Sequence, residues 1–450
     1  YADSNKMKEV TIMPLFLTIL FVSFIVFFLS TNVWKRSAIE GMLAVFLIFL
    51  IFAPFEQVID SFFAPISSPV FHAIVLYLLA GAIFERLYVF EQAYLFGSNY
   101  FHKSPKWQTF FPLVAQTFMA SISGAAENNV RITEPKIRKW QTMHHVSPAF
   151  TKNSTIAVSV LAHILPPAGI ISLTYAVYNY LYPHEFTVSE WWIIAYGLGV
   201  LFFIHRWLSL HLMYRLHRID LSSPQPMPLE KKWRGTWLVL FVPILIFLPI
   251  AFDAFAAPWI AKRITPEAQA QLSFRILMFA PIFAIFYVLL INQRFVPKKR
   301  RMRQLVHLLE DSMLAIIPAS IMTYFACVSL ELFIRLDAKE ELMQWATAFD
   351  DQLGILFVLL SIVIVAMIFP GPIAVTLFGG TWLVLADTFS WNAWTLATLL
   401  PAFTGSIEGM MGLWSIQTNA YEELFQSSKM TLFWFGTHLL LLVSLFVIFH

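Results

Sequence analysis

The sequence predicts an all-α integral membrane protein built from two inverted repeats; the composition and the order of the apolar segments support this prediction. Of the 450 residues, 58% are hydrophobic and 13% are charged, with a mean hydropathy of +0.69, whereas a soluble globular protein carries about 25% charged residues. Uninterrupted apolar stretches such as 12–31 and 430–449 are long enough to cross a hydrocarbon core of roughly 30 Å as helices. We therefore expect the lipid bilayer to be the main solvent.

The apolar segments recur in the same order in the two halves of the chain. The first, 12–31, follows Lys6 and Lys8 as a signal peptide would, but it lacks a small-residue cleavage site, and we interpret it as a retained span. The first repeat, 7–221, contains spans at 12–31, 38–55, 68–86 and 190–213, an interrupted region at 107–135 and a proline-broken stretch at 150–182. A polar cytoplasmic linker, 222–234, leads to the second repeat, 235–450, with spans at 235–252, 273–293, 306–335 and 430–449, an interrupted region at 353–388 and a broken stretch at 392–424. Matching segments lie roughly 220 to 245 residues apart, a period that favours two halves.

The charged residues predict how the segments are oriented. We interpret 107–135 and 353–388 as re-entrant hairpins, which return to the side of the membrane from which they enter and do not count as crossings. Each half then crosses the membrane five times. Because five is odd, the second half is inverted relative to the first. With the N-terminus outside, the basic connections lie inside, as the distribution of Lys and Arg requires: Lys35, 86–106, 136–145, 215–234 and 294–303. The neutral or acidic connections at 56–60, 183–190 and 337–351 lie outside, and the residues that depart from the pattern are Lys262, Arg263, Arg335 and Lys339. We expect a multi-pass protein of the cytoplasmic (inner) membrane.

Several function classes are disfavoured. The single cysteine, Cys327, forbids an internal disulfide and a cysteine-rich metal site. The sequence has no HExxH, Walker loop or nucleophile elbow, so we predict no catalytic residues, no enzyme and no ATP-driven transport by this chain alone. Each basic cluster flanks a span, which indicates membrane topology rather than nucleic-acid binding. His205, His211 and His217 are six residues apart and point in different directions around a helix, a poor arrangement for one metal.

Breaks in the helical pattern inside apolar sequence mark the candidate site. Irregular backbone at membrane depth is tolerated only where protein buries it or water reaches it. The four breaks are 121–129, Pro166-Pro167, Pro370-Gly371-Pro372 and 404–409. They occupy corresponding positions in the two halves, which indicates a site near the membrane midplane between the halves. His163, three residues before Pro166, is either a proton relay or a packed, hydrogen-bonded histidine.

The candidate substrate-binding residues are small, hydroxylic, amide-bearing or acidic. They are Ser121, Ser123, Gly124, Glu127, Asn128 and Asn129 in the first half, and Thr404, Gly405, Ser406 and Glu408 in the second. Their oxygens suit a polar solute and, with carbonyls of broken helices, a Na⁺ ion, for which we single out Ser123, Asn128, Gly405 and Glu408. No other cofactor is expected. Gln417, Thr418 and Asn419 either line the same cavity or mark its cytoplasmic exit.

The two acidic candidates each have an alternative interpretation. Glu408 is the leading one, because ionisable residues inside a membrane are costly and functional by default; it is a cation ligand, a proton carrier or a hydrogen-bond acceptor, or else it caps a half-helix. Glu127, Arg131 and Glu134 lie at helical spacings and could form an ion-pair ladder instead of a site. If Arg131 is free, its guanidinium suits a carboxylate or phosphate of the solute.

The run FMASISGAAENNVRITEPKI, residues 118–137, resembles the first hairpin of the concentrative nucleoside transporters and the wider Gate, or nucleoside-recognition, membrane families. There a Gly-x-x-Glu segment precedes a proline-containing amphipathic arm, and the matching residues are Gly124 and Glu127. Residues 76–93 are similar to the Gate helix, and the sequence from Leu309 resembles a second copy. Asn128 and Asn129 stand where those families have a small residue and a proline.

The same region is similar to the large permease subunit of the tripartite TRAP transporters. SGAA at 123–126 and ILPPAGI at 164–170 match the hairpin and the broken helix of that family in spacing, and the resemblance in outline covers most of the chain. Both resemblances imply a scaffold domain and an elevator-type transport domain, usually coupled to Na⁺ and in some nucleoside carriers to H⁺. The second also implies partner chains, either a separate membrane subunit or a solute-binding protein.

We therefore expect a secondary active transporter of a small polar or anionic solute, coupled to Na⁺ or H⁺. The expected partners are the solute and the bilayer, without nucleic acid, and we expect a homo-oligomer. A non-transporting Gate-type membrane protein that acts as a structural or interaction partner is the main alternative. A membrane enzyme acting on a lipid phosphate, with Arg131 and Glu134 as the phosphate clamp and base, is a third.

Overall fold

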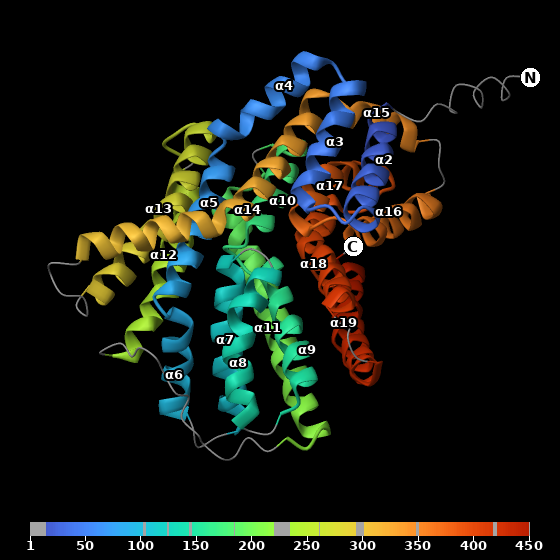
Figure 1. Ribbon diagram of the computed structural model, residues 1–450. Helices are drawn as coiled ribbons and strands as arrows, with labels where there is room; N and C mark the ends of the chain where they lie inside the picture. The colour runs from blue at the N-terminus through green and yellow to red at the C-terminus, as the bar shows by residue number, and fades with distance from the viewer. Residues whose placement is uncertain are drawn as a thin grey trace, which may run out of the picture.

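The computed structural model describes residues 15–449 apart from 102–104, 124–125, 144–145, 184, 220–234, 261, 294–300, 348–350 and 417–420 (Figure 1). The side chains of some helical residues, among them Ser123, Glu127, Asn128, Arg131 and Glu408, also lie outside the described part. All regular structure in the described ranges is helical, without a strand. The all-α prediction is confirmed.

The helices of the predicted first half lie between residues 15 and 216. In chain order they are α2 (Leu15–Phe28), η1 (Leu29–Val33), α3 (Ala38–Phe52), α4 (Phe55–Phe63), η2 (Ala64–Ser67), α5 (Pro69–Arg86), α6 (Val89–Phe101), α7 (Pro105–Ser123), α8 (Ala126–Met143), α9 (Pro148–Ser159), η3 (Val160–His163), α10 (Gly169–Leu181) and α11 (Val188–Leu216).

The helices of the predicted second half lie between residues 236 and 449. They are η4 (Thr236–Leu240), α12 (Phe241–Ile260), α13 (Pro266–Gln293), α14 (Arg301–Arg335), α15 (Ala338–Ala346), α16 (Asp351–Ala366), α17 (Gly371–Thr388), α18 (Ala393–Ile416) and α19 (Tyr421–Phe449). Capping side chains explain two of the starts in the chain. Ser37 with Glu40 and Thr187 with Glu190 form capping boxes at the N-termini of α3 and α11.

Six helical segments in the described part of the chain are long and apolar enough to span a membrane: Leu15–Val33, Pro69–Arg86, Val188–Leu216, Thr236–Ala256, Pro266–Asn292 and Met302–Arg335. Large apolar side chains such as Phe255 and Ile448 are exposed on the surface, as expected for helices solvated by lipid. The chain is therefore a membrane-spanning protein. The sequence predicts ten crossings, and those beyond these six segments stay predictions, although five shorter apolar helices accompany the six.

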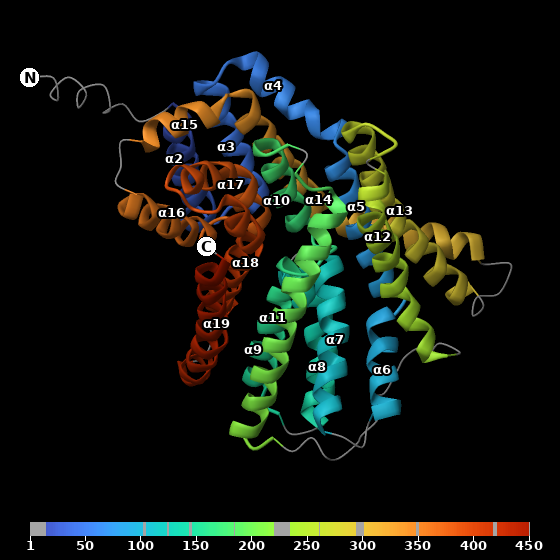
Figure 2. The same ribbon diagram turned by 180° about the vertical axis from the view of Figure 1, so that it is seen from behind.

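Helices α7 and α8 pack side by side as an antiparallel hairpin. In both views the start of α7 and the end of α8 lie at the end of the molecule where α6 finishes (Figures 1 and 2). The end of α7 and the start of α8 lie in the middle of the molecule, and the two helices are in contact. The hairpin spans 105–143, somewhat longer than the interrupted region 107–135 that the sequence predicts. Helix α9 follows and packs along α8.

The stretch 150–182 divides at its prolines. Helix α9 passes into the 3₁₀ turn η3, the segment 164–168 is not helical, and α10 begins at Gly169. The Pro166-Pro167 peptide bond is cis. Neither proline has an N–H to donate to a helix, so the break follows from the sequence.

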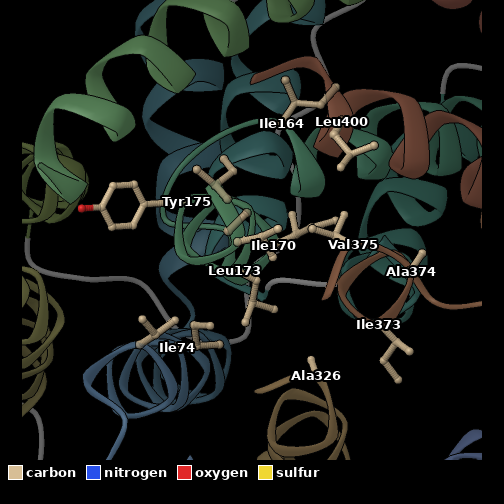
Figure 3. Close-up of a cluster of buried hydrophobic side chains, with 14 of the residues drawn as sticks. Ile74, Ile164, Ile170, Leu173, Tyr175, Ala326, Ile373, Ala374, Val375 and Leu400 are labelled. Atoms are coloured by element: carbon tan, nitrogen blue, oxygen red, sulfur yellow. The ribbon is translucent and has the colours of Figure 1, made fainter. Parts of the chain in front are cut away.

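The central core lies where α10 meets α17. Figure 3 shows Val375 of α17 beside Ile170 of α10, with Leu173 of α10 close by and Ile373 and Ala374 on other sides of α17. Side chains of α5, α14 and α18 complete the cluster, including Ile74, Ala326 and Leu400. Each of these side chains is at most 5% exposed. The core therefore joins helices from both halves of the chain.

Candidate functional site

A strip of buried polar side chains lies between the α7–α8 hairpin and helix α9. Its members are at most 3% exposed: Gln116 of α7, Asn129 and Thr133 of α8, and Thr151, Asn153, Thr155 and Ser159 of α9. The hydroxyls on α9 recur every four residues and therefore share one face of that helix. We call these residues the polar strip.

Ser159 connects the three helices of the polar strip. Its hydroxyl accepts a hydrogen bond from Asn129 Nδ2 (2.9 Å) and donates one to the carbonyl of Thr155 (2.8 Å). Gln116 Nε2 donates to the same carbonyl (2.9 Å) and lies 3.5 Å from Ser159 Oγ. Buried polar groups cost free energy unless they are hydrogen-bonded, so these bonds hold both arms of the hairpin against α9.

Asn129 has an acceptor atom that the described residues leave without a partner. The side chain is fully buried, and no described donor reaches its Oδ1. The orientation of the amide follows from the network, because Ser159 uses its proton on Thr155 and must accept from the amide nitrogen. A buried acceptor without a donor requires an explanation such as a bound ion, solute or water. The partner of this oxygen is a cation or a hydrogen-bond donor.

Helix α18 reaches this region through Gly405. A Cβ added at Gly405 would lie 2.6 Å from Cβ of His163 in η3, closer than real side chains approach. His163 is fully buried, as are Thr404 and Ser406 on either side of the glycine. Gly405 therefore serves a close approach between a helix of the second half and the broken helix of the first.

The structure corrects the prediction that 404–409 breaks a helix. Helix α18 is continuous from Ala393 to Ile416 and includes Thr404, Gly405, Ser406 and Glu408, so the predicted broken stretch 392–424 has no break in that range. The hydroxyls of Thr404 and Ser406 donate to the carbonyls of Leu400 and Ala402 within the same helix. A hydroxyl that bonds the preceding turn is compatible with a helix, and the glycine is explained by packing. Residues 417–419, the predicted lining or exit, lie outside the described residues.

A cavity of about 370 Å³ lies beside the hairpin. Thr117 and Ser121 of α7 line it together with Pro166 and Pro167, and its other walls come from α11 and α12, including Tyr196, Phe203 and Phe247. Thr117 Oγ1 is buried and has no partner among the described residues, whereas Ser121 donates to the carbonyl of Phe118. The cavity separates the hairpin and the proline break from the helices across from them.

A second cavity, of about 630 Å³, lies at the far end of α10. The loop after α10 and the loop before α18 form it, with Tyr182, Glu185, Asp387 and Trp394 among its lining residues. Tyr178 Oη donates to Glu185 Oε2 at 2.6 Å. The exposed carboxylates of Glu185 and Asp387 make this cavity polar.

Arg206 of α11 is fully buried against α19. Its Nη2 lies 2.9 Å from Nδ1 of His438, and its guanidinium lies 5.0 Å from the ring of Trp434. The ring of Phe202 in turn lies 4.5 Å from that of His438. Arg206 and His438 are 232 residues apart, and so are Phe202 and Trp434.

The predicted site residues fall into three groups. The structure brings Ser121, Asn129, Pro166 and Pro167 around the hairpin and places Thr404, Gly405 and Ser406 beside η3. Pro370, Gly371 and Pro372 begin α17, with Pro370 as its N-cap, and the neighbouring Phe369 stacks on Phe27 of α2. The side chains of Ser123, Glu127, Asn128 and Glu408, and all of Gly124, lie outside the described part. Among the described residues no group of three or more His, Cys, Asp or Glu could hold a metal.

Of the predicted ladder of Glu127, Arg131 and Glu134, only the Glu134 side chain is described, and the ladder stays a prediction. Glu134 accepts a bond from Nε of Arg138 (2.7 Å), and Lys136 pairs with Glu91 of α6 (2.7 Å). The side chain of Arg131 lies outside the described residues. The hairpin arm is therefore held to α6 by a pair that the sequence does not indicate.

Gln116, Ser159 and Arg206 are not among the site residues predicted from the sequence. The spacing of Thr151, Thr155 and Ser159 is a signal that could have found the polar face of α9, because hydroxyls at every fourth position align along a helix. Arg206 sits among apolar residues, and an arginine there is a functional candidate by the same rule that selected Glu408.

We expect Ser159→Ala to lower the free energy of unfolding by about 1–3 kcal/mol, because it leaves the buried amide donors of Asn129 and Gln116 without the hydroxyl acceptor. Thermal unfolding of the purified protein in detergent measures the effect. Ser444→Ala is the matched control, since its hydroxyl also bonds a preceding carbonyl but is exposed, and it should change the stability by less than about 0.5 kcal/mol. Equal effects of the two substitutions would contradict the role of Ser159.

No protein-family model matches the chain, and no curated protein matches it either.

Proposed function

We propose that the protein is a secondary active transporter of a small polar or anionic solute, coupled to Na⁺ or H⁺, with an elevator-like alternating-access mechanism. The observation that carries the proposal is the polar strip, and above all the fully buried Asn129 whose Oδ1 has no partner among the described residues. Polar side chains inside a membrane protein are costly and mark the paths of ions and solutes. The hairpin, α9–η3 and α18 would cradle the cargo.

Helices α11 and α19 cross antiparallel to each other. Phe202 packs on His438 and Arg206 packs on Trp434, so a step of four residues forward on α11 matches a step of four residues back on α19. A two-fold axis that relates two halves of a chain requires its corresponding helices to cross in this way. The contact therefore agrees with the inverted-repeat arrangement that we propose, in which α11 and α19 are the last helices of the two halves and each half crosses the membrane five times.

The distribution of connections supports the same arrangement. Helices α6, α8 and α11 finish at one end of the molecule, and α4 and α15 lie at the opposite end (Figure 1). The sequence around those three helix ends is rich in Lys and Arg, and the charge rule places such segments in the cytoplasm. We therefore propose a multi-pass protein of the inner membrane with its N-terminus outside.

Coupling would act through Glu127 and Glu408. In the backbone, Glu127 is in the first turn of α8, two residues before Asn129, and Glu408 is in α18, three residues after Gly405. Binding of a cation to these carboxylates would neutralise them and organise the hairpin, so that the solute binds the loaded form better. The transport domain, loaded with cation and solute, can then move across the membrane.

The test is uptake into proteoliposomes under imposed Na⁺ and pH gradients. We expect accumulation of at least one small carboxylate or polar solute that follows one of the two gradients, and we expect Glu408→Gln to reduce the gradient-driven rate by at least about 10-fold, the effect of losing roughly 1.4 kcal/mol of coupling. Glu341→Gln, an exposed carboxylate in the first turn of α15, is the control and should transport normally.

Two results would overturn the proposal. One is uptake of every screened solute that ignores both gradients, and the other is normal coupled transport by Glu408→Gln. A stable stoichiometric complex with another membrane protein, unaffected by any solute, would instead favour the structural role.

A further inference from the structure

We propose that Arg206 and His438 form a binding site for a small anion, of the class of a carboxylate or a similarly sized oxyanion, between α11 and α19. The site is separate from the polar strip and does not depend on transport. It rests on the charge and on the hydrogen-bonding atoms that the described structure leaves without partners.

Arg206 carries a positive charge inside the protein. Its side chain is fully buried, and no described carboxylate pairs with it. An arginine stays protonated in proteins, and a buried charge without a counter-charge is strongly unfavourable. The guanidinium also faces the ring of Trp434. The attraction between a cation and an indole ring replaces only part of the stabilisation that water gives to an exposed guanidinium. A buried guanidinium in this environment is therefore stabilised by a counter-ion.

The contact with Arg206 determines which nitrogen of His438 carries the proton. Arginine has no acceptor, so the 2.9 Å contact requires Arg206 Nη2 to donate to Nδ1 of His438. The imidazole is then neutral with its proton on Nε2, which makes Nε2 a donor. That atom is buried and has no partner among the described residues.

The atoms around Arg206 that lack a hydrogen-bond partner are mostly donors. Four unpartnered buried atoms belong to the three side chains in contact, Nε and Nη1 of Arg206, Nε2 of His438 and Nε1 of Trp434, and all four are donors. Nδ1 of His205, whose ring lies 5.9 Å from that of His438, is also buried without a partner among the described residues, and it donates or accepts according to its tautomer. A water molecule would accept hydrogen bonds from some of these donors but would leave the charge of Arg206 uncompensated. An anion supplies both the hydrogen-bond acceptors and the counter-charge. Arginine offers two parallel N–H groups to the two oxygens of a carboxylate, the geometry in which such pairs are strongest.

The position of the site on α11 relates it to the proline break. Gly199, Phe202 and Arg206 lie on the same buried face of α11. A Cβ at Gly199 would lie 2.5 Å from Leu165 Cδ2, so this face packs directly on the break before α10. Arg206 lies seven residues further along, about 10 Å down the helix axis. An anion bound to Arg206 would therefore neutralise a charge on the helix that packs against the proline break.

The test is thermal unfolding of delipidated protein in detergent, titrated with sodium formate. Sodium gluconate, a much bulkier anion than formate, keeps the ionic strength constant. We expect a saturable rise of the unfolding midpoint with formate, on the order of 2–4 °C. Arg206→Met should lose this rise and, in gluconate alone, should unfold at the same temperature as the wild type or higher, because the uncompensated charge is gone. A purely structural arginine would instead give a lower midpoint in every buffer.

A control variant and a second measurement accompany this test. Arg275→Met removes an exposed arginine from α13 and should keep the full response to formate. If Arg206→Met does not fold, equilibrium dialysis of labelled formate against the wild type should still show about one bound anion per chain. A formate response retained by Arg206→Met, no bound formate, or a response to a short-chain phosphatidylglycerol but not to formate would each overturn the assignment to a small free anion.

Discussion

Lys136→Met is expected to lower the free energy of unfolding by about 3 kcal/mol, among the largest single effects in this chain. The Lys136 ammonium lies 2.7 Å from Glu91, whose side chain is only 7% exposed. Removing the lysine leaves a buried carboxylate without its partner, and Glu91 Oε2 already has none among the described residues. The hairpin arm α8 would lose its polar attachment to α6.

The single buried cysteine provides the measurement. Cys327 is 5% exposed, so a thiol-reactive dye labels it only when the chain unfolds, and the midpoint of labelling against temperature reports stability. The double substitution Lys136→Met with Glu91→Gln should recover most of the loss, since it removes the uncompensated charge. Arg36→Met, in an exposed pair with Glu40, should change the stability by less than about 1 kcal/mol. A double variant as unstable as the single one would show that the lysine acts by packing.

Gly405→Ala is expected to lower the free energy of unfolding by about 2 kcal/mol, although alanine favours helices. The new methyl group would lie 2.6 Å from Cβ of His163, an atom that moves only with its backbone, so η3 and α18 would have to separate. If these elements cradle the cargo, solute uptake should fall with stability. The same thermal labelling assay, followed by uptake at a temperature where the variant is folded, separates the two effects.

Gly436→Ala is the matched control for Gly405→Ala. It lies in the long helix α19, and a Cβ there meets nothing within 4 Å. The substitution should raise the stability by up to about 1 kcal/mol through helix propensity alone. Changes of the same sign in the two variants would contradict the close approach of α18 to η3.

The sequence predicted the fold class and the proline break because both follow from local chemistry. Apolar runs of about 20 residues can satisfy their backbone in lipid only as helices, and Pro166 followed by Pro167 cannot continue α9. The hairpin turn also had local signals, since Ser123 and Gly124 precede a polar run. Its exact extent did not, because Pro112 and Pro135 lie inside the two arms without ending them.

The remaining parts of the site depend on which helices meet, and a single sequence does not carry that information. Gly405 looked like a break because glycine, serine and threonine favour irregular backbone, but tertiary packing against His163 accounts for it. Ser159 looked like one hydroxyl among many until Asn129 and Gln116 converged on it. Arg206 stands out only in the structure, which shows it buried without a carboxylate among the described residues and next to the unpartnered donors of His438 and Trp434.

Arg206 and His438 are unlike residues at what would be equivalent positions of two related halves. On a two-fold axis each residue faces its own copy, so a dimer of one identical half would set arginine against arginine or histidine against histidine. Two facing guanidinium groups repel, and a hydrogen bond needs a donor on one side and an acceptor on the other. If the proposed two-fold arrangement holds, the two halves must therefore differ in sequence at this position, so that one supplies the donor and the other the acceptor.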